Sequence, residues 1–435
     1  MSGTATGHPP TRRSPVGQYW GMAGTEGKDP GESETGTPVD EDEVDRRVDR
    51  LLADLPPERV EAGDFLGAQF DRGLAWVHFP GGMGGLGASP GLHQRVVARL
   101  AAAGAPSAAR RNVLGYGMVA PTLVVHGTDG QRQRYLRPLF TCTEIWCQLF
   151  SEPGAGSDVA SLATAAVRDG DEWVLNGQKV WTTAAHLADL GLVITRTDPG
   201  VPKHRGLTAF LVDMHGVGVE VRPLHQITGE AEFNEVFFSG ARVPDAARLG
   251  GEGEGWRVAV TTLMNERVSI GAGVSRRGGG PIAAALAIWK ARWQGSSAPE
   301  AAVFRDRLVS LWAAAEATRL TNIRAGQLRR SGTPGPDGSV AKLAFAEQNQ
   351  RIFELCVDLL GAEGMLHSSD YPKIRPTEVG LEGADVHKAF LRARANSIEG
   401  GTSEVMRNIL GERVLGLPGE PRTDKDPPWR DVPRS

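Results

Sequence analysis

The chain has 435 residues, of which 40% are hydrophobic, so it can build two or three folded domains. Its 48 Lys and Arg nearly balance 52 Asp and Glu, which argues against nucleic acid or an anionic membrane as the main partner. Three cysteines are too few for a disulfide scaffold and lack the paired spacing of a metal site. We expect a cytoplasmic protein with no membrane span, since no apolar run approaches the roughly 20 residues that cross a bilayer.

The two ends of the chain differ in composition from the rest. Residues 1–40 are rich in Gly, Pro, Ser and Thr without an apolar period, which predicts a disordered leader. Residues 419–435 contain four prolines and predict a flexible tail. Just after the leader, apolar residues recur at helical spacing, so residues 41–144 are predicted to form an N-terminal helical domain.

The middle of the chain changes to β-prone sequence. Asn176-Gly177 separates two β-prone runs, and this dipeptide is the strongest short hairpin signal because both residues tolerate positive φ. We therefore predict a hairpin at this point, within a β domain that spans residues 145–250. The predicted strands are 172–175, 179–183, 207–213, 219–223 and 234–238.

Helical periodicity returns in residues 251–418. The predicted helices cover 254–275, 281–293, 301–331, 337–361, 384–396 and 402–416. A helical, then β, then helical order predicts segregated domains and an α+β fold that is mostly α, rather than an alternating βαβ sheet.

The usual catalytic motifs are absent or weak. Gly82 to Gly87 satisfies the dinucleotide pattern G-x-G-x-x-G, but no acidic residue follows about 20 positions later. A glycine-rich loop is the better interpretation. The sequence also lacks H-E-x-x-H, G-x-S-x-G and P-loop motifs, which removes the usual support for zinc hydrolase, serine hydrolase and NTPase functions.

One predicted helix places a carboxylate among apolar residues. Glu266 shares a face of helix 254–275 with four apolar residues: Trp256, Ala259, Leu263 and Ile270. Burial of an unpaired carboxylate raises its pKa, as a general base near neutral pH requires. From this pattern alone, an ion pair with an Arg, or a position at the solvent-exposed margin of the apolar face, is the better explanation of Glu266.

Four segments together resemble the acyl-CoA dehydrogenase family over residues 41–418. They are Phe150 to Asp158 (FSEPGAGSD), Asn176 to Thr183 (NGQKVWTT), Asn265-Glu266-Arg267, and Gly401 to Glu404 (GTSE). The resemblance implies an N-terminal helical domain, a middle β domain and a C-terminal four-helix bundle. It also implies FAD, α,β-desaturation of an acyl-CoA thioester, an electron-transfer flavoprotein as acceptor, and a homotetramer.

The resemblance further implies roles for individual residues. Positions that match flavin-binding residues of the family are Gln148, Phe150, Ser151, Trp181, Thr183, Gly361, Thr402 and Glu404. Among these, Gly361 matches a segment that reaches the FAD of a neighbouring subunit. Ser157, Arg267 and Gly400 match positions near the substrate, and the Gly400 N–H would polarise the thioester carbonyl.

The catalytic base is where this sequence departs from most of the family. The usual Glu immediately before Gly401 is replaced by Gly400, which cannot take a proton. Glu399 lies one residue earlier and should point elsewhere. Isovaleryl-CoA dehydrogenase-type members instead place the base on the preceding helix, directly before an Arg. That position is Glu266, so we expect Glu266 to be the base.

Two alternatives stay open at this point. The same fold serves flavin oxidases and monooxygenases, which act on substrates other than CoA thioesters. Alternatively, the chain is a base-deficient subunit of a heterotetramer. The stretch Arg292 to Gly295 also lacks the Phe that the family carries in an FAD-binding Arg-x-x-Phe-Gly stretch.

Overall fold

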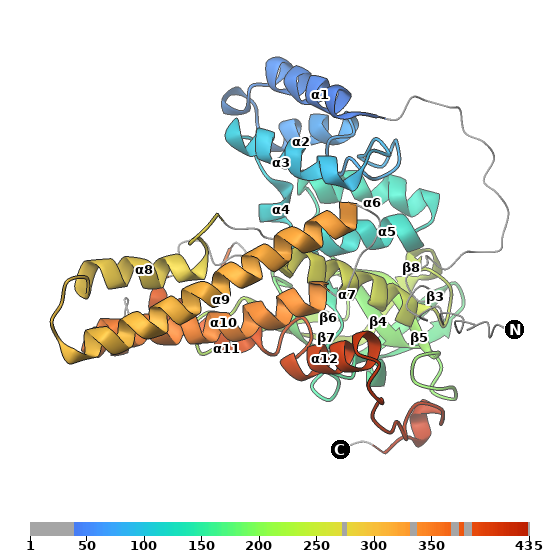
Figure 1. Cartoon of the computed structure of the whole chain (residues 1–435). Coiled ribbons are helices and arrows are strands. Elements are labelled where there is room, and N and C mark those ends of the chain that lie inside the picture. The colour runs from blue at the N-terminus through green and yellow to red at the C-terminus, as the bar shows by residue number, and fades with distance from the viewer. Residues whose placement is uncertain (1–38, 272–275, 331–336, 367–373, 378–384, 434–435) are drawn as a thin grey trace, which may run out of the picture. The chain divides into compact units, whose positions relative to one another are not determined.

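The computed structural model describes residues 39–271, 276–330, 337–366, 374–377 and 385–433. Within these ranges, the side chains of residues 267–271, 329–330 and 337 are not described. The predicted leader therefore lies outside the described residues, apart from its last two positions. The helical, β and helical order predicted from the sequence is confirmed (Figure 1).

Short helices form the first part of the described chain, and local sequence explains where they begin. Asp40 accepts a hydrogen bond from the Glu43 N–H at 2.8 Å and caps the first helix. Val44, Val48 and Leu51 are buried on one face of that helix at helical spacing. The helices are α1 Glu41–Asp54, α2 Ala62–Asp71, α3 His93–Ala102, α4 Ala108–Arg111, α5 Ala120–His126 and α6 Asp129–Thr141.

An eight-stranded sheet occupies the middle of the chain. Its order is β6-β7-β3-β2-β4-β5-β8, and β1 pairs in parallel with β4. The strands are β1 Trp146–Leu149, β2 Ala165–Asp169, β3 Glu172–Thr183, β4 Leu190–Arg196, β5 Leu207–Asp213, β6 Val219–Pro223, β7 Phe233–Pro244 and β8 Arg248–Leu249. The strands predicted at 207–213 and 219–223 are confirmed at both ends.

The hairpin predicted at Asn176-Gly177 is wrong. β3 continues through both residues, and its pairing register with β7 shifts between Leu175 and Asn176. Gly177 has φ +152°, and a Cβ on it would lie 2.5 Å from the Thr164 hydroxyl oxygen. Positive φ therefore serves a β-bulge here instead of a turn. The true two-residue turn lies between β2 and β3, at Gly170 and Asp171.

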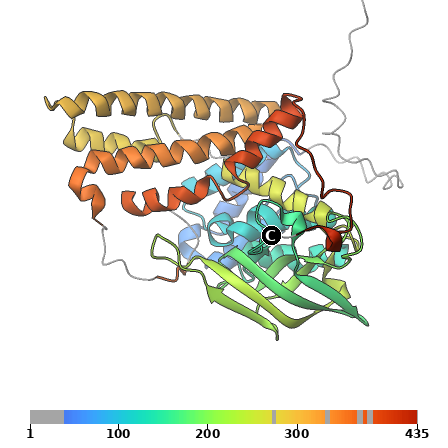
Figure 2. The ribbon, with the colours of Figure 1, turned by 90° about the horizontal axis from the view of Figure 1, so that it is seen from below.

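The C-terminal helices pack around α10. The helices are α7 Gly255–Gly271, α8 Pro281–Arg292, α9 Pro299–Arg330, α10 Asp337–Leu360, α11 Val386–Asn396 and α12 Ser403–Ile409. α8, α9 and α11 each contact α10 (Figures 1 and 2). Their core includes Ile282, Leu308, Ile352 and Leu355. α7 contacts α10 on one side and strands β4 and β5 on the other.

The last described segment is not the flexible tail that its prolines predicted. Trp429 is only 8% exposed, and its backbone N–H donates to Val201 O at 2.9 Å. Pro428 forms a β-bridge with Pro202 in the β domain. A large aromatic side chain that buries most of its surface outweighs the low regularity of the surrounding sequence.

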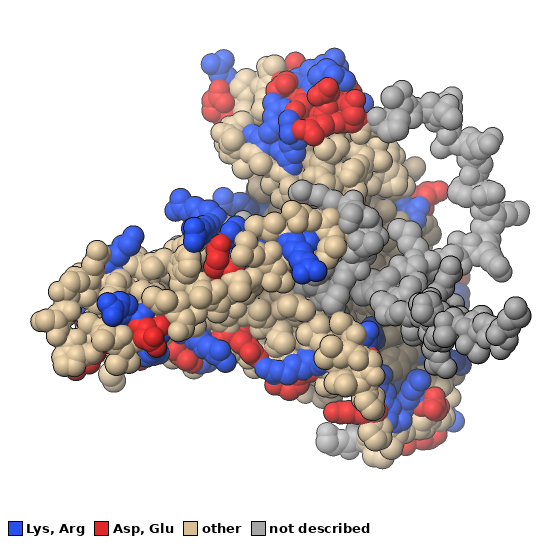
Figure 3. All heavy atoms as spheres, viewed as in Figure 1, with Lys and Arg blue, Asp and Glu red and all other residues tan. Residues whose placement is uncertain are grey.

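Charged side chains of both signs are interspersed over the face shown in Figure 3. On α1 and α3 they form ion pairs, among them Arg95 with Asp45 at 2.5 Å. None of the described helices is long and apolar enough to span a membrane. The described residues also contain no cluster of three or more potential metal ligands.

Candidate active site

A buried ion pair fixes the segment that follows β1. Lys179 on β3 is fully buried, and its Nζ donates to Glu152 Oε1 at 2.8 Å and to Phe150 O at 3.0 Å. Glu152 also accepts from the Ala163 N–H at 2.6 Å and the Thr164 N–H at 2.9 Å. Burial lowers the pKa of Lys179 to about 8, although the Glu152 charge opposes this shift. These bonds tie the segment beginning at Phe150 to the sheet.

The same segment lies beside Trp181 on β3. The Val180 N–H donates to Ser151 O at 2.9 Å, which places Ser151 one residue from Trp181 along the paired backbone. Trp181 has φ +59° and lies in a second register shift of β3, between Lys179 and Thr182. Trp181 is 57% exposed, which is unusual for a tryptophan in a central strand. Thr183 follows it, half-buried and paired with β7.

A chain of contacts connects Trp181 to the loop before α12. The Trp181 and Phe233 rings meet edge to face with centroids 5.8 Å apart. The guanidinium of Arg392 on α11 lies 5.5 Å from the Phe233 ring and donates to Glu232 at 3.1 Å. It also donates to both oxygens of Glu399, at 3.0 and 2.8 Å. Glu399 is therefore turned toward α11.

Two glycines and a helix start follow Glu399. Gly400 and Gly401 have φ values of +63° and +90°, a region that favours glycine. The Thr402 hydroxyl accepts from the Val405 N–H at 3.1 Å and caps α12, and Glu404 is exposed in the first turn. Lys342 on α10 donates to Gly401 O. The loop is thereby fixed to the bundle as well as to the sheet.

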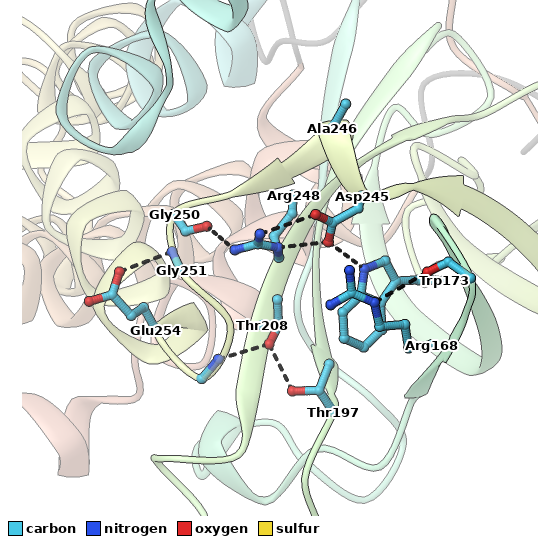
Figure 4. A network of polar contacts seen from close by, with 12 residues as sticks. Arg168, Trp173, Thr197, Thr208, Asp245, Ala246, Arg248, Gly250, Gly251 and Glu254 are labelled. Atoms are coloured by element: carbon cyan, nitrogen blue, oxygen red, sulfur yellow. Dashed lines mark hydrogen bonds and ion pairs between the residues drawn. The ribbon is translucent and has the colours of Figure 1, made fainter.

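The loop that leads into α7 and the first residue of that helix are anchored on the sheet (Figure 4). Thr208 Oγ1 on β5 accepts from the Gly253 N–H at 3.1 Å, and Glu254 accepts from the Gly251 N–H at 3.0 Å. A Cβ on Gly255 would lie 2.6 Å from the Thr208 nitrogen, so only glycine allows this close approach. The anchored helix carries Glu266, which is half-buried.

A second set of contacts in Figure 4 supports this anchor from the adjacent loop. Arg248 donates to Gly250 O at 2.9 Å and to Asp245 at 3.0 Å, and the Trp173 indole N–H donates to the same carboxylate at 2.8 Å. The hydrogen bond from Arg248, helped by that from Trp173, lowers the pKa of Asp245 to about 2. The carboxylate is thus ionised at neutral pH.

The remaining predicted residues are less closely connected. Gln148 is half-buried on β1, Ser157 is exposed beyond the Glu152 turn, and the side chain of Arg267 lies outside the described residues. Gly361 follows the end of α10. It lies 19 residues from Lys342, or roughly 28 Å along a helix. Within one chain, the structure therefore does not bring Gly361 to the other predicted residues.

These residues fit a planar heteroaromatic group such as the flavin ring that the sequence resemblance implies. Trp181 offers an exposed aromatic surface. Among the described residues, the buried hydroxyls of Thr182 and Ser403 have no hydrogen-bond partner. Buried polar atoms are normally paired, so both hydroxyls are available to a polar ligand.

Sequence reasoning assigned no role to three residues that hold this arrangement together: Lys179, Glu152 and Arg392. Lys179 and Glu152 lie within the quoted motifs, but nothing in a linear sequence indicates that they pair. A lysine in the middle of a β-prone run is the one signal that pointed to a buried charge.

Family comparisons cover most of the chain. Three family models match in order: Acyl-CoA dehydrogenase N-terminal domain over residues 42–143, middle domain over 147–241 and C-terminal domain over 253–415. Acyl-CoA dehydrogenase IpdE1 of Mycobacterium tuberculosis is 40% identical over 349 residues, which cover 80% of this chain and 86% of that protein. Acyl-CoA dehydrogenase FadE34 of the same organism is 39% identical over 84% of this chain, but this covers only 47% of that protein.

Two solved structures show the same fold. The Tcur3481-Tcur3483 steroid ACAD has a TM-score of 0.66 and 25% identity, over 89% of this chain and 100% of that chain. The ChsE4-ChsE5 complex from Mycobacterium tuberculosis has a TM-score of 0.65 and 28% identity, also over 89% of this chain and 100% of that chain.

Proposed function

The chain belongs to the acyl-CoA dehydrogenase family, and on that premise we propose that Glu266 removes the α-proton of an acyl-CoA thioester. The family depends on FAD, which makes the protein an FAD-dependent oxidoreductase acting on CH–CH bonds. When bound, FAD supplies the acceptor for the hydride that leaves the β-carbon. The chain itself must bind the thioester, hold the base beside the α-carbon and exclude water.

The hydrogen bonds of Glu399 are the observation that supports Glu266 as the base. The position before Gly401 is a glycine, and the carboxylate one residue earlier is held by Arg392. Asn396 Nδ2 also donates to Glu399 at 2.8 Å. These bonds hold the Glu399 side chain against α11. Glu266, half-buried on the anchored helix α7, has the position that the family resemblance gives to the base.

The other residues then take the following proposed roles. Ser151, Trp181 and Thr183 would surround the flavin ring, together with Phe150 and Gln148. The N–H of Gly400 would donate to the thioester carbonyl, where negative charge develops as the proton leaves. Ser157 and Arg267 would contact the CoA side of the substrate, and Thr402 and Glu404 the adenylate side of FAD. An electron-transfer flavoprotein would reoxidise the enzyme.

Anaerobic titration of the flavin with acyl-CoAs tests this assignment. Glu266→Gln should retain the visible flavin spectrum but slow flavin reduction by 10²–10⁴-fold, the usual contribution of a general base. Glu399→Gln is the matched control and should change the reduction rate by less than about tenfold. Equal rates in Glu266→Gln and the unmodified enzyme would refute the role of Glu266, and a large loss only in Glu399→Gln would move the base there.

The acyl group that we propose is a bulky, steroid-type one, because one of the two similar structures is that of a steroid ACAD. The titration should therefore include a steroid-side-chain acyl-CoA beside straight-chain and branched ones. Bleaching by short straight-chain substrates alone would contradict this choice. Rapid oxygen consumption with a substrate that is not a CoA thioester would instead support an oxidase.

A heteromeric assembly is the second proposal, and Arg292 motivates it. Arg292 begins the stretch that is nearest in sequence to the family's FAD-binding Arg-x-x-Phe-Gly, and it is paired with Glu363, two residues after Gly361. The stretch also lacks the family's Phe, which would weaken its contact with the FAD of a neighbouring subunit. One related structure is named the ChsE4-ChsE5 complex, and the name of the other joins two components, Tcur3481-Tcur3483. We expect the chain expressed alone to hold less FAD than with a co-expressed partner. Full FAD occupancy in a homotetramer would refute this.

A further inference from the structure

The C-terminal strap, defined as residues 421–432, is anchored on the β domain through Trp429. The Trp429 indole N–H donates to Ser161 O at 3.1 Å, and its backbone N–H donates to Val201 O at 2.9 Å. The guanidinium of Arg196 lies 4.5 Å from the Trp429 ring, within the range of a cation–π contact. The strap therefore closes over the residues that directly follow the Ser157-Asp158 turn.

Lys203 connects the strap to that turn. Its Nζ lies 2.7 Å from Asp158 Oδ2 and 2.6 Å from Asp424 Oδ2, with only 8% of the side chain exposed. Because one ammonium bonds both carboxylates, the position of Asp424 on the strap constrains the position of Asp158 in the turn. The Asp158 and Asp424 charges raise the pKa of Lys203 despite its burial, so it stays protonated at neutral pH.

Arg196 holds the other side of the same turn. Its guanidinium donates to Ala160 O at 2.6 Å, Leu162 O at 3.2 Å and Lys203 O at 2.7 Å. Trp429 covers this guanidinium, which shields the three bonds from water. Residues 158–162 are thus held at several points by groups that the strap contacts.

The contact between the strap and α12 is weaker than the contact with the β domain. Arg422 pairs with Glu412, three residues beyond the end of α12, at 3.2 Å, and the Arg422 side chain is 59% exposed. A cavity of about 420 Å³ separates the strap from α12, with Val405, Asn408 and Ile409 on the helix side. An exposed ion pair across such a gap contributes little to stability. The strap therefore acts mainly on the turn at Asp158.

We propose that the C-terminal strap positions the Ser157-Asp158 turn for the pantetheine chain of acyl-CoA, with Lys203 and Trp429 as positioning residues. The inference rests on the proposed role of Ser157. An exposed turn that is held in place before binding does not have to be ordered by the ligand, which favours affinity. The strap thereby affects substrate binding and leaves the chemical step to the groups around Glu266.

Binding of coenzyme A to the FAD-loaded enzyme, measured by calorimetry, tests the proposal together with KM and kcat. Trp429→Ala and Asp424→Asn should each raise the Kd for coenzyme A and the KM for acyl-CoA about tenfold, with kcat within about twofold. Lys203→Met should do the same, whereas Lys203→Arg keeps a cation and should restore most of the affinity. Arg430→Ala, an exposed strap side chain, is the matched control and should change neither constant.

Unchanged Kd values in Trp429→Ala and Asp424→Asn would overturn the proposal. So would a fall in FAD content, thermal stability and kcat at constant Kd, since that result describes a purely structural clamp. If Trp429→Ala does not fold, Asp424→Asn decides, because it removes one charge at a partly exposed site. If acyl-CoA reduces the flavin of the unmodified enzyme and the strap variants bind coenzyme A normally, only the proposed role of the strap is refuted. An unmodified enzyme that neither bleaches nor binds coenzyme A refutes the proposed function as well.

Discussion

Replacement of Lys179 by methionine would remove the cation from the buried ion pair beneath the candidate site. The substitution keeps the length and apolar volume of the side chain, so packing changes little. It leaves Glu152 in the interior without its counter-charge, and it removes the donor to Phe150 O.

The expected loss of stability follows from what remains around Glu152. Removal of one partner of a buried pair costs about 3–5 kcal/mol. Two backbone N–H groups, at 2.6 and 2.9 Å, still stabilise the carboxylate. We therefore expect the lower end, about 3 kcal/mol in the free energy of unfolding of the β domain. The double variant with Glu152→Gln should regain about 1 kcal/mol, because no uncompensated charge is left, although the amide nitrogen cannot accept from one of the two backbone N–H groups.

Urea unfolding followed by tryptophan fluorescence measures this loss, and flavin absorbance of the purified protein reports FAD retention. Arg242→Ala is the matched control, on β7, the strand that pairs with β3. Arg242 pairs with Asp169 at 2.8 Å and with Glu172 at 2.9 Å, but all three side chains are exposed. Its loss should cost at most about 1 kcal/mol.

The reasoning fails if Lys179→Met unfolds within about 1 kcal/mol of the unmodified protein or is no less stable than Arg242→Ala. It also fails if the double variant is less stable than Lys179→Met alone. FAD content should fall with stability, since the pair holds the segment at Phe150 and Ser151.

Two further predictions concern stability. Gly177→Ala should cost about 1–3 kcal/mol in urea unfolding, because its Cβ would overlap Thr164 at a positive φ, whereas the open helical site Gly63→Ala should cost nothing. Burial, and secondarily the charge of His78, lowers the pKa of His93 from 6.5 to about 4. As the pH falls, His93 is therefore protonated in the unfolded chain before it is protonated in the folded protein. The melting temperature should therefore fall as the pH drops from 6.5 to 4, and this fall should be smaller in His93→Gln. An equal fall in the melting temperature of His93→Gln and of the unmodified protein would contradict this explanation.

Periodicity and motif order predicted much of the fold without a structure. The helices between Pro281 and Asn396 and the strands 207–213 and 219–223 follow from local pattern, because each buries one face at a fixed period. The family motifs also identified most residues now found around Trp181 and the loop at Gly400. These signals are local in the chain, and a linear sequence carries them directly.

Other features depend on contacts between distant parts of the chain, and only the tertiary structure reveals them. Asn176-Gly177 suits a turn or a bulge, and β7, paired along the whole of β3, makes it a bulge. Trp429 in a proline-rich segment becomes an anchor because Arg196 and Ser161 lie in reach. Lys179 and Glu152 stand 27 positions apart, so only the sheet makes them a pair. The conformation and burial of these residues depend on partners that are distant in the chain, and a sequence by itself does not identify those partners.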